Sequence, residues 1–233
     1  MKPITKFEKP GSEPAPPRDV HEGPDPAEDS SRYLSRRETT GKHTARRQQA
    51  IDAAAAIFAR VGYQGASTRA IASALGIKVA SLYFHIGSKE DALAEICLLG
   101  MQRSLGYLEE ASHRDTLSEQ IRHFFECQCE DHIQHADYVA VSTRERAHLS
   151  EPMQMRIQEM TRQFRANIDA MFERAKERGE LNPDLTPRHC RFIMIGTLRG
   201  ISEMYMSGVD FTNSDIMDKW IEALIRGMVV ERA

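Results

Sequence analysis

The sequence has 233 residues, 41% of them hydrophobic, which is long enough for one or two domains with a buried core. Its formal net charge of -3 excludes a polycation but not a local basic surface. It contains no run of 18 apolar residues and no basic-then-apolar leader, so no membrane span or secretory signal is expected and a cytoplasmic protein is predicted. The four cysteines form no CxxC pair, which favours free thiols over a disulfide framework.

The first segment, residues 1–41, is predicted to be a disordered arm. It holds seven prolines and charges of both signs, and it has too few large apolar side chains to offset the entropy lost on ordering. Its end is basic from Arg32 to Arg47. A flexible basic lead-in of this kind either touches a DNA groove or is simply solvated, and the solvated interpretation is preferred.

A helical pattern begins at His43, and glycines divide it into four helices. Apolar residues at helical spacing run from Ile51 to Val61, where Gly62 ends the first helix. Two short helices follow, one from Ser67 or Thr68 to Leu75 and one from about Val79 to His85, joined by a turn at Gly76. Ser88 is predicted to cap the fourth helix after a break at Gly87. Two short helices around a tight glycine turn are typical of a helix-turn-helix, although this pattern alone is a weak signal.

The pattern stays helical beyond Leu93, and no segment alternates as a strand would. First-turn prolines are expected at Pro152 and Pro187. The sequence therefore predicts an all-α fold. The later helices are expected near 88–111, 116–135, 137–149, 152–178, 187–206 and 214–231.

A longer motif makes the helix-turn-helix specific. It comprises Ala66-Ser67-Thr68-Arg69-Ala70-Ile71-Ala72, then Gly76-Ile77, then Ser81-Leu82-Tyr83-Phe84-His85-Ile86, then Ser88-Lys89-Glu90 and Leu93. Over about residues 46–96 the chain resembles the TetR family of bacterial regulators. The resemblance implies a three-helix DNA-binding domain over 42–92, a larger helical domain for effector binding and dimerisation over 93–233, and repression relieved by a small molecule.

The resemblance also implies roles for the residues that match the motif. Thr68, Arg69, Tyr83, His85 and Lys89 are expected to contact phosphates, and Arg69 could instead meet a base edge. The positions expected to face base edges are Lys78, Val79, Ala80, Ser81 and Phe84. Lys78 stands where a small hydroxyl residue often caps the reading helix, which removes a cap but adds a cation. Between Lys42 and Asp91, seven basic and three acidic residues give a local net charge of +4.

The region after residue 93 holds phenylalanines and methionines at helical spacings, most of which are expected to be core. The resemblance implies an effector pocket among these helices, suited to a small and largely apolar molecule. The candidate pocket residues are Phe124, Tyr138, Glu145, Met160, Phe164, Ile168 and Met171.

Glu145 interrupts an apolar stripe and is flanked by Arg144 and Arg146. One interpretation is a polar anchor for an effector, or an arginine pair that receives a carboxylate. The other is an internal ion pair or a surface edge, and this second interpretation is preferred.

Potential metal ligands gather between His123 and His135. His123, Cys127 and Glu130 share one helical face, but a structural zinc site usually takes ligands in tighter pairs from separate elements. No metal and no cofactor is therefore expected.

The last two helices are predicted to form the interface of a homodimer. Gly196 and Gly200 are four residues apart on one face, which allows close backbone approach, or they simply let helices pack within one chain. The candidate interface residues are Ile193, Gly196, Thr197, Gly200, Trp220 and Leu224. Two-fold symmetry would place the reading helices about 34–36 Å apart, or a multiple of that distance, on a palindromic DNA duplex.

Three functions compete. The preferred one is a ligand-responsive repressor released from a palindromic operator by an effector. An all-α enzyme is disfavoured because no glycine-rich phosphate loop, nucleophile elbow or HExxH motif is present. A helical adaptor that binds protein rather than DNA is disfavoured by the set of Tyr83, His85 and Lys89.

Overall fold

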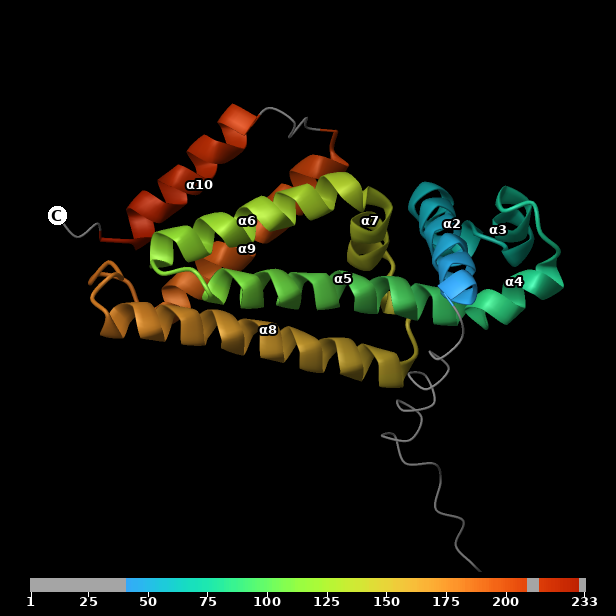
Figure 1. The fold of residues 1–233 in the computed structure, drawn as a ribbon, viewed down its shortest axis with the longest axis horizontal. Coiled ribbons are helices and arrows are strands. Elements are labelled where there is room, and N and C mark those ends of the chain that lie inside the picture. Colours follow the sequence, from blue (N-terminus) through green and yellow to red (C-terminus); the bar gives the residue numbers. More distant parts are fainter. Residues whose placement is uncertain (1–40, 209–213, 231–233) are drawn as a thin grey trace, which may run out of the picture. The chain divides into compact units, whose positions relative to one another are not determined.

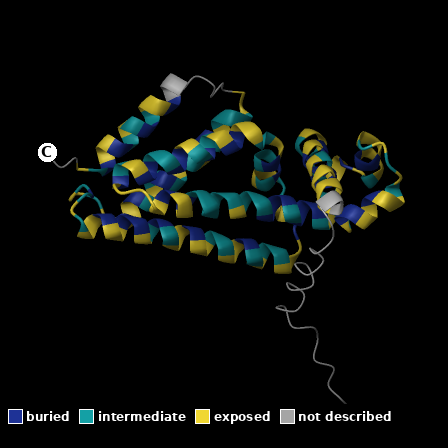
Figure 2. Cartoon of the chain, in the orientation of Figure 1, coloured by how far each residue is buried: buried dark blue, intermediate teal, exposed yellow. Residues whose placement is uncertain are grey.

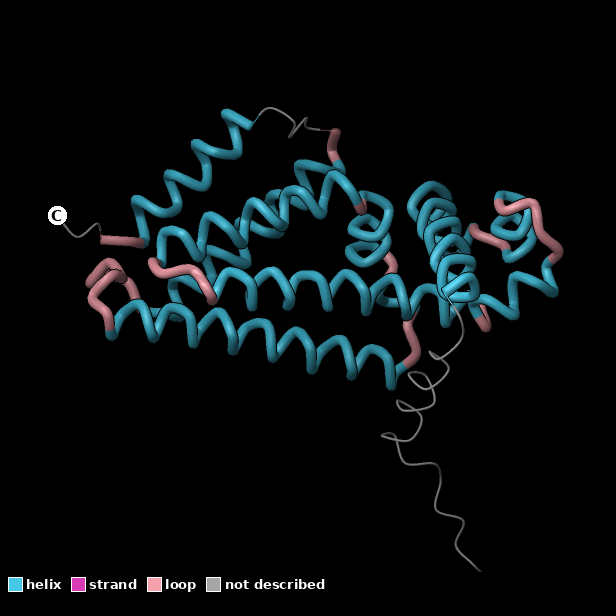
Figure 3. The backbone as a smooth tube through the Cα atoms, viewed as in Figure 1, coloured by secondary structure: helices cyan, strands magenta, loops and turns pink. Residues whose placement is uncertain are grey.

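The computed structural model describes residues 41–208 and 214–230, with side chains described for 44–208 and 217–230. The expected N-terminal arm lies outside these residues except at Gly41. The fold and sites below belong to the unit that begins at Ala45. The described residues are almost entirely helical (Figures 1 and 3). Their only strand-like pairing is an isolated bridge between Leu181 and Val229. The predicted all-α class is confirmed.

The first three helices form the predicted helix-turn-helix region. Helix α2 spans Gly41–Gly65 but breaks at Gly62, whose φ of 75° is favourable only for glycine. Helix α3 spans Thr68–Ala74, and Ser67 rather than Thr68 caps it by accepting a hydrogen bond from the Ala70 amide. Helix α4 spans Val79–Ile86, and its first residue follows Lys78, which makes no side-chain cap.

The remaining helices follow the predicted order. They are α5 (Lys89–Ser112), α6 (Leu117–Gln134), α7 (Ala136–Arg144), the short 3₁₀ turn η1 (Arg146–His148), α8 (Glu151–Glu177), α9 (Pro187–Met206) and α10 (Ser214–Met228). Reciprocal capping boxes begin α5, with Ser88 and Asp91, and α6, with Thr116 and Glu119. The helix predicted over 137–149 is shorter, because it ends at Arg144 and continues as η1.

Helix α5 packs against α6, α7 and α8, while α8 packs on α9 and α6 on α10. Buried residues alternate with exposed ones along these helices (Figure 2), and the buried apolar side chains form two clusters. The N-terminal core joins apolar residues of α2–α4 to the first half of α5 and to Tyr138, Val141, Leu149 and Ile157. The C-terminal core joins the second half of α5 to α6, α8, α9 and α10. The N-terminal core thus draws residues from both sides of the boundary predicted at residue 92.

Two further findings concern the whole described chain. Within residues 41–208 and 214–230, no helix is both long and apolar enough to cross a membrane. All four cysteines are free, with Cys97 and Cys190 buried and Cys127 and Cys129 half-buried.

Candidate DNA interface

Helix α4 carries large side chains on two opposite faces, one of which is buried and the other exposed. Leu82 and Ile86 are fully buried in the N-terminal core. On the other face, Phe84 is 72% exposed and Tyr83 is 46% exposed. Lys78, Ala80 and Ser81 are exposed beside them, and Val79 is half-buried. A short helix that shows aromatic rings to solvent while its other face is anchored has the form of a reading surface for a partner.

The beginning of α3 lies against this surface. The Thr68 hydroxyl lies 3.4 Å from the Tyr83 hydroxyl, and Arg69 next to it is exposed. Two hydroxyls therefore lie close together at the junction of α3 with the outer face of α4, and the exposed Arg69 is the next residue along α3. Such side chains can donate hydrogen bonds to phosphate oxygens on one strand of a DNA duplex.

His85 does not lie on the exposed face. Only 8% of its surface is accessible, and it points with Leu82 and Ile86 toward the core. The expected phosphate contact by His85 is therefore not supported by its position. Its carbonyl oxygen instead accepts a hydrogen bond of 2.6 Å from Nη1 of Arg47, which also forms an ion pair with Glu95. Arg47 fixes the end of the reading helix.

Lys89 also has internal partners. Its ammonium group donates to the carbonyls of Tyr63 at 2.8 Å and Ala66 at 3.1 Å, and lies 4.2 Å from the centre of the Tyr63 ring. Tyr63 lies in the last turn of α2, after the break at Gly62, and Ala66 lies between α2 and α3. Lys89 therefore joins the start of α5 to the end of α2 and the α2–α3 connection, a role different from the phosphate contact expected of it.

The predicted effector residues do not surround one space. Tyr138 and Met160 pack in or against the N-terminal core, whereas four others lie buried in the C-terminal core: Phe124, Phe164, Ile168 and Met171. An open hollow of about 260 Å³ lies between α2, α7 and the end of α9, and none of the predicted residues lines it.

Glu145 lies apart from these side chains, at the end of α7. Its carboxylate is 3.6 Å from Nε2 of His148 and an equal distance from where a side chain on Gly62 would begin. The ring of His148 in turn stacks on Tyr63. This geometry agrees with the internal ion pair rather than with an effector anchor.

A buried polar cluster lies between α5 and α6, and the sequence pattern did not predict it. Asp131 is buried and accepts hydrogen bonds from Nε of Arg103 at 2.5 Å and from the hydroxyl of Tyr107 at 3.0 Å. Nη2 of Arg103 and Nε2 of the buried Gln128 have no partner among the described residues. Burial together with the bond to Asp131 raises the pKa of Tyr107 to about 12, so the phenol keeps its proton. Two unused donors thus face the protein interior.

The predicted dimer residues divide into two groups. Gly200 faces the indole of Trp220, whose Cη2 is 3.6 Å from where a Cβ would be, so this glycine serves packing within the chain. Gly196 is exposed, and a Cβ there would meet no atom of the described residues within 4 Å. Ile193, Leu224 and Trp220 are half-buried against the C-terminal core, and Thr197 is buried. Only part of the set therefore remains available to a second chain.

Two family profiles match the chain over most of its described length. The profile described as "Bacterial regulatory proteins, tetR family" matches residues 50–96, and the profile "Tetracyclin repressor-like, C-terminal domain" matches residues 114–228. No curated protein sequence matches the chain.

Solved structures share the fold at low sequence identity. PfmR from Thermus thermophilus is 23% identical with a TM-score of 0.69, covering 78% of this chain and 99% of its own. KstR2 of Mycobacterium tuberculosis, described as a ketosteroid transcriptional regulator, is 23% identical with a TM-score of 0.70, covering 80% and 96%. FadR from Bacillus subtilis, solved in complex with stearoyl-CoA, is 20% identical with a TM-score of 0.64, covering 77% and 98%. Together with the two profile matches, these likenesses establish that the chain belongs to the TetR family of bacterial transcriptional regulators.

Proposed function

We propose that this regulator is a homodimeric repressor that binds a palindromic operator and is released from it by a small, largely apolar effector. The proposal that the protein binds DNA rests on the outer face of α4, where Phe84 and Tyr83 are exposed near Thr68 and Arg69. The description of the C-terminal profile as repressor-like supports repression rather than activation.

Operator binding can be tested with the purified chain and the intergenic DNA upstream of its own gene. A repressor of this kind shifts that DNA with an affinity that falls steeply with salt, and it binds a full palindrome much more tightly than a half-site. Addition of the chain to an in vitro transcription reaction is expected to lower the yield from the same promoter. Salt-independent binding, or equal affinity for half-site and palindrome, would contradict the proposal.

Dimerisation is assigned to the outer face of α9 together with α10. Phe192 is 60% exposed on this face, four residues before the exposed Gly196. Because a Cβ at Gly196 would meet no described atom within 4 Å, Gly196→Glu is expected to disrupt the dimer and leave the subunit folded. Gly106→Glu on α5 is the matched control, since its position is equally open. If sedimentation velocity finds that both variants are dimeric, α9 does not form part of the interface.

We propose that the effector binds beside the buried polar cluster of α5 and α6. Gln128 lies one helical turn from Phe124, and Arg103 lies 5.2 Å from the ring centre of Tyr138, so two predicted effector residues flank the unused donors. An apolar molecule with a carbonyl or carboxylate end fits this combination, because the donors would otherwise remain buried and unsatisfied. Stearoyl-CoA and a ketosteroid are suitable first probes, given the two solved relatives.

The effector test uses Gln128→Leu, which removes the amide but keeps a side chain of similar bulk. The variant is expected to bind the operator as the unchanged chain does and to need about tenfold more of a releasing probe, since a hydrogen bond is worth about 1 kcal/mol or more. An identical release curve would place the effector elsewhere.

Tyr138 gives the effector site a physical connection to α2. Its hydroxyl donates to Asp52 at 2.6 Å and accepts from Gln48 at 2.9 Å, while its ring lies beside Arg103. A displacement of Arg103 would therefore be passed to the helix that carries the helix-turn-helix. Tyr138→Phe removes only the hydroxyl, and it is expected to weaken effector-driven release while retaining operator binding.

A further inference from the structure

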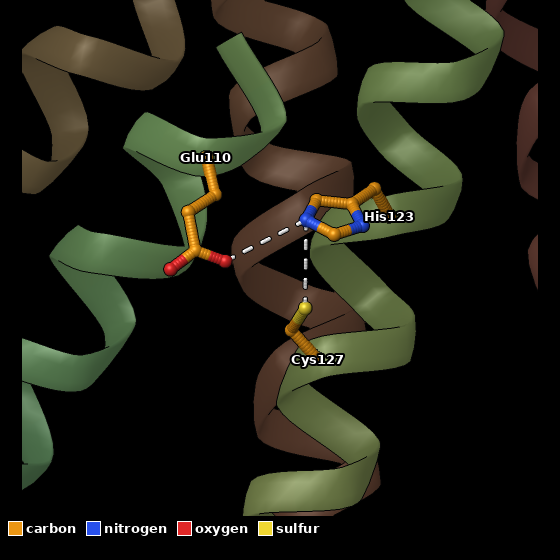
Figure 4. Close-up of side chains that lie close together, drawn as sticks. All are labelled: Glu110, His123 and Cys127. Atoms are coloured by element: carbon orange, nitrogen blue, oxygen red, sulfur yellow. Dashed lines mark hydrogen bonds and ion pairs between the residues drawn. The ribbon is translucent and has the colours of Figure 1, made fainter. Parts of the chain in front are cut away.

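Three side chains with metal-binding chemistry meet between α5 and α6, away from the DNA interface. Glu110 comes from the last turns of α5, while His123 and Cys127 are four residues apart on one face of α6 (Figure 4). Nε2 of His123 lies 3.7 Å from Oε2 of Glu110 and 3.7 Å from Sγ of Cys127. All three ligand atoms lie within 4.8 Å of one another.

This donor set and spacing suit a tetrahedral cation. Zinc binds sulfur at about 2.3 Å and nitrogen or oxygen at about 2.0–2.2 Å, so tetrahedral angles place its ligand atoms about 3.3–3.6 Å apart. The observed separations need only a small closure of exposed or half-buried side chains. We propose that Glu110, His123 and Cys127 bind a thiophilic divalent cation such as Zn²⁺, with water completing the coordination.

The structure identifies a carboxylate ligand that the sequence pattern did not predict. His123, Cys127 and Glu130 share one helical face, but the carboxylate of Glu130 accepts a hydrogen bond from Gln134 and lies outside the cluster of ligand atoms. Glu110 provides the carboxylate instead, from a neighbouring helix. Ligands from two separate elements are typical of protein zinc sites, so this geometry removes the reason for expecting no metal.

Arg114 competes with the metal for His123. Its Nη2 lies 3.3 Å from Nδ1 of His123, a contact that requires Nδ1 to accept and leaves the proton on Nε2. A cation on Nε2 reverses this tautomer, so Nδ1 carries the proton and the guanidinium must turn away. Arg114 is exposed and free to do so. Removing the guanidinium is therefore expected to strengthen metal binding.

The test uses the full-length chain under reducing conditions after treatment with a chelator. Isothermal titration with Zn²⁺ is expected to give one ion per chain, and Co²⁺ is expected to give the absorption of a tetrahedral site with a thiolate ligand. His123→Ala and Cys127→Ser should each weaken binding more than roughly 100-fold, beyond the 10- to 100-fold effect typical of an outer-shell partner. Arg114→Ala should tighten it.

Two matched controls test the identity of the ligands. Cys129→Ser should bind as the unchanged chain does, and Glu110→Gln should weaken binding while Glu130→Gln does not. The site is refuted if the chain takes up neither ion, if uptake survives loss of His123 and Cys127, or if Glu130 matters in place of Glu110. Operator binding is a separate measurement, so these results are independent of the proposed repression.

Discussion

The role of Lys89 can be decided by one substitution, Lys89→Met. The methionine keeps the length of the aliphatic stem but removes the ammonium group that donates to the carbonyls of Tyr63 and Ala66. The end of α2 and the α2–α3 connection then lose these hydrogen bonds to α5, while the start of α5 remains capped by Ser88.

The expected loss is about 2 kcal/mol of unfolding free energy. A hydrogen bond to a charged group contributes about 1.5–3 kcal/mol, and a cation over a partly exposed ring contributes about 0.5–1 kcal/mol. Lys89 is half-buried and makes two such hydrogen bonds, but water can reach the carbonyls once the ammonium group is gone. We therefore count the two hydrogen bonds together at the lower end, about 1.5 kcal/mol, and add about 0.5 kcal/mol for the ring contact.

Urea unfolding at fixed protein concentration measures this loss, and operator titrations at several salt concentrations measure the other possible role. Each phosphate contact contributes about 0.9 to the slope of log affinity against log salt. Lys89→Met is expected to lower stability with little change in slope, whereas Arg69→Met, at an exposed cation expected to contact a phosphate, should lower the slope and leave stability unchanged. An unfolding free energy unaffected by Lys89→Met, with a slope reduced by about one, would refute the internal role.

Three further substitutions follow from the structure. Phe84→Ala should change the free energy of unfolding by less than about 0.5 kcal/mol, because Phe84 is 72% exposed. It should nevertheless weaken operator binding about tenfold or more, measured by fluorescence anisotropy. Equal losses of stability and binding would contradict a role in reading DNA. Gly87→Ala should cost about 2 kcal/mol in urea unfolding, because φ is +75° and a Cβ would lie 2.5 Å from Oδ2 of Asp91. Burial lowers the pKa of His132 below 6.5, so in that range the unfolded chain binds more protons and stability should fall as pH drops below 6.5. His132→Gln should flatten this decline in melting temperature, whereas His113→Gln, at an exposed histidine, should not.

The helices were predictable from sequence because their ends depend on local chemistry. Glycines that adopt a positive φ, at positions 62, 76 and 87, and hydroxyl caps such as Ser88 act within a few residues of the helix that they end or begin. The burial of His85 was also predictable from the sequence. It stands three residues after Leu82, on the stripe that continues to Ile86, so its helical position indicated the core.

The partners of charged side chains were not predictable in this way. Lys89 reaches carbonyls 23 and 26 residues earlier in the chain, and Glu110 reaches His123 across a helix junction. Such contacts depend on how helices pack, which spacing along one helix does not specify. For the same reason, periodicity could not separate a pocket wall from ordinary core at Phe124 or Ile168, both of which are fully buried.

The N-terminal core has a consequence for how the protein loses its structure. Because residues of α7 and α8 belong to the same apolar cluster as residues of α2, α3 and α4, an excised fragment ending at residue 92 would expose part of that cluster to water. We therefore expect the operator-reading helices to melt in the same cooperative step as α7, with matching amide-exchange rates, rather than as an independent module.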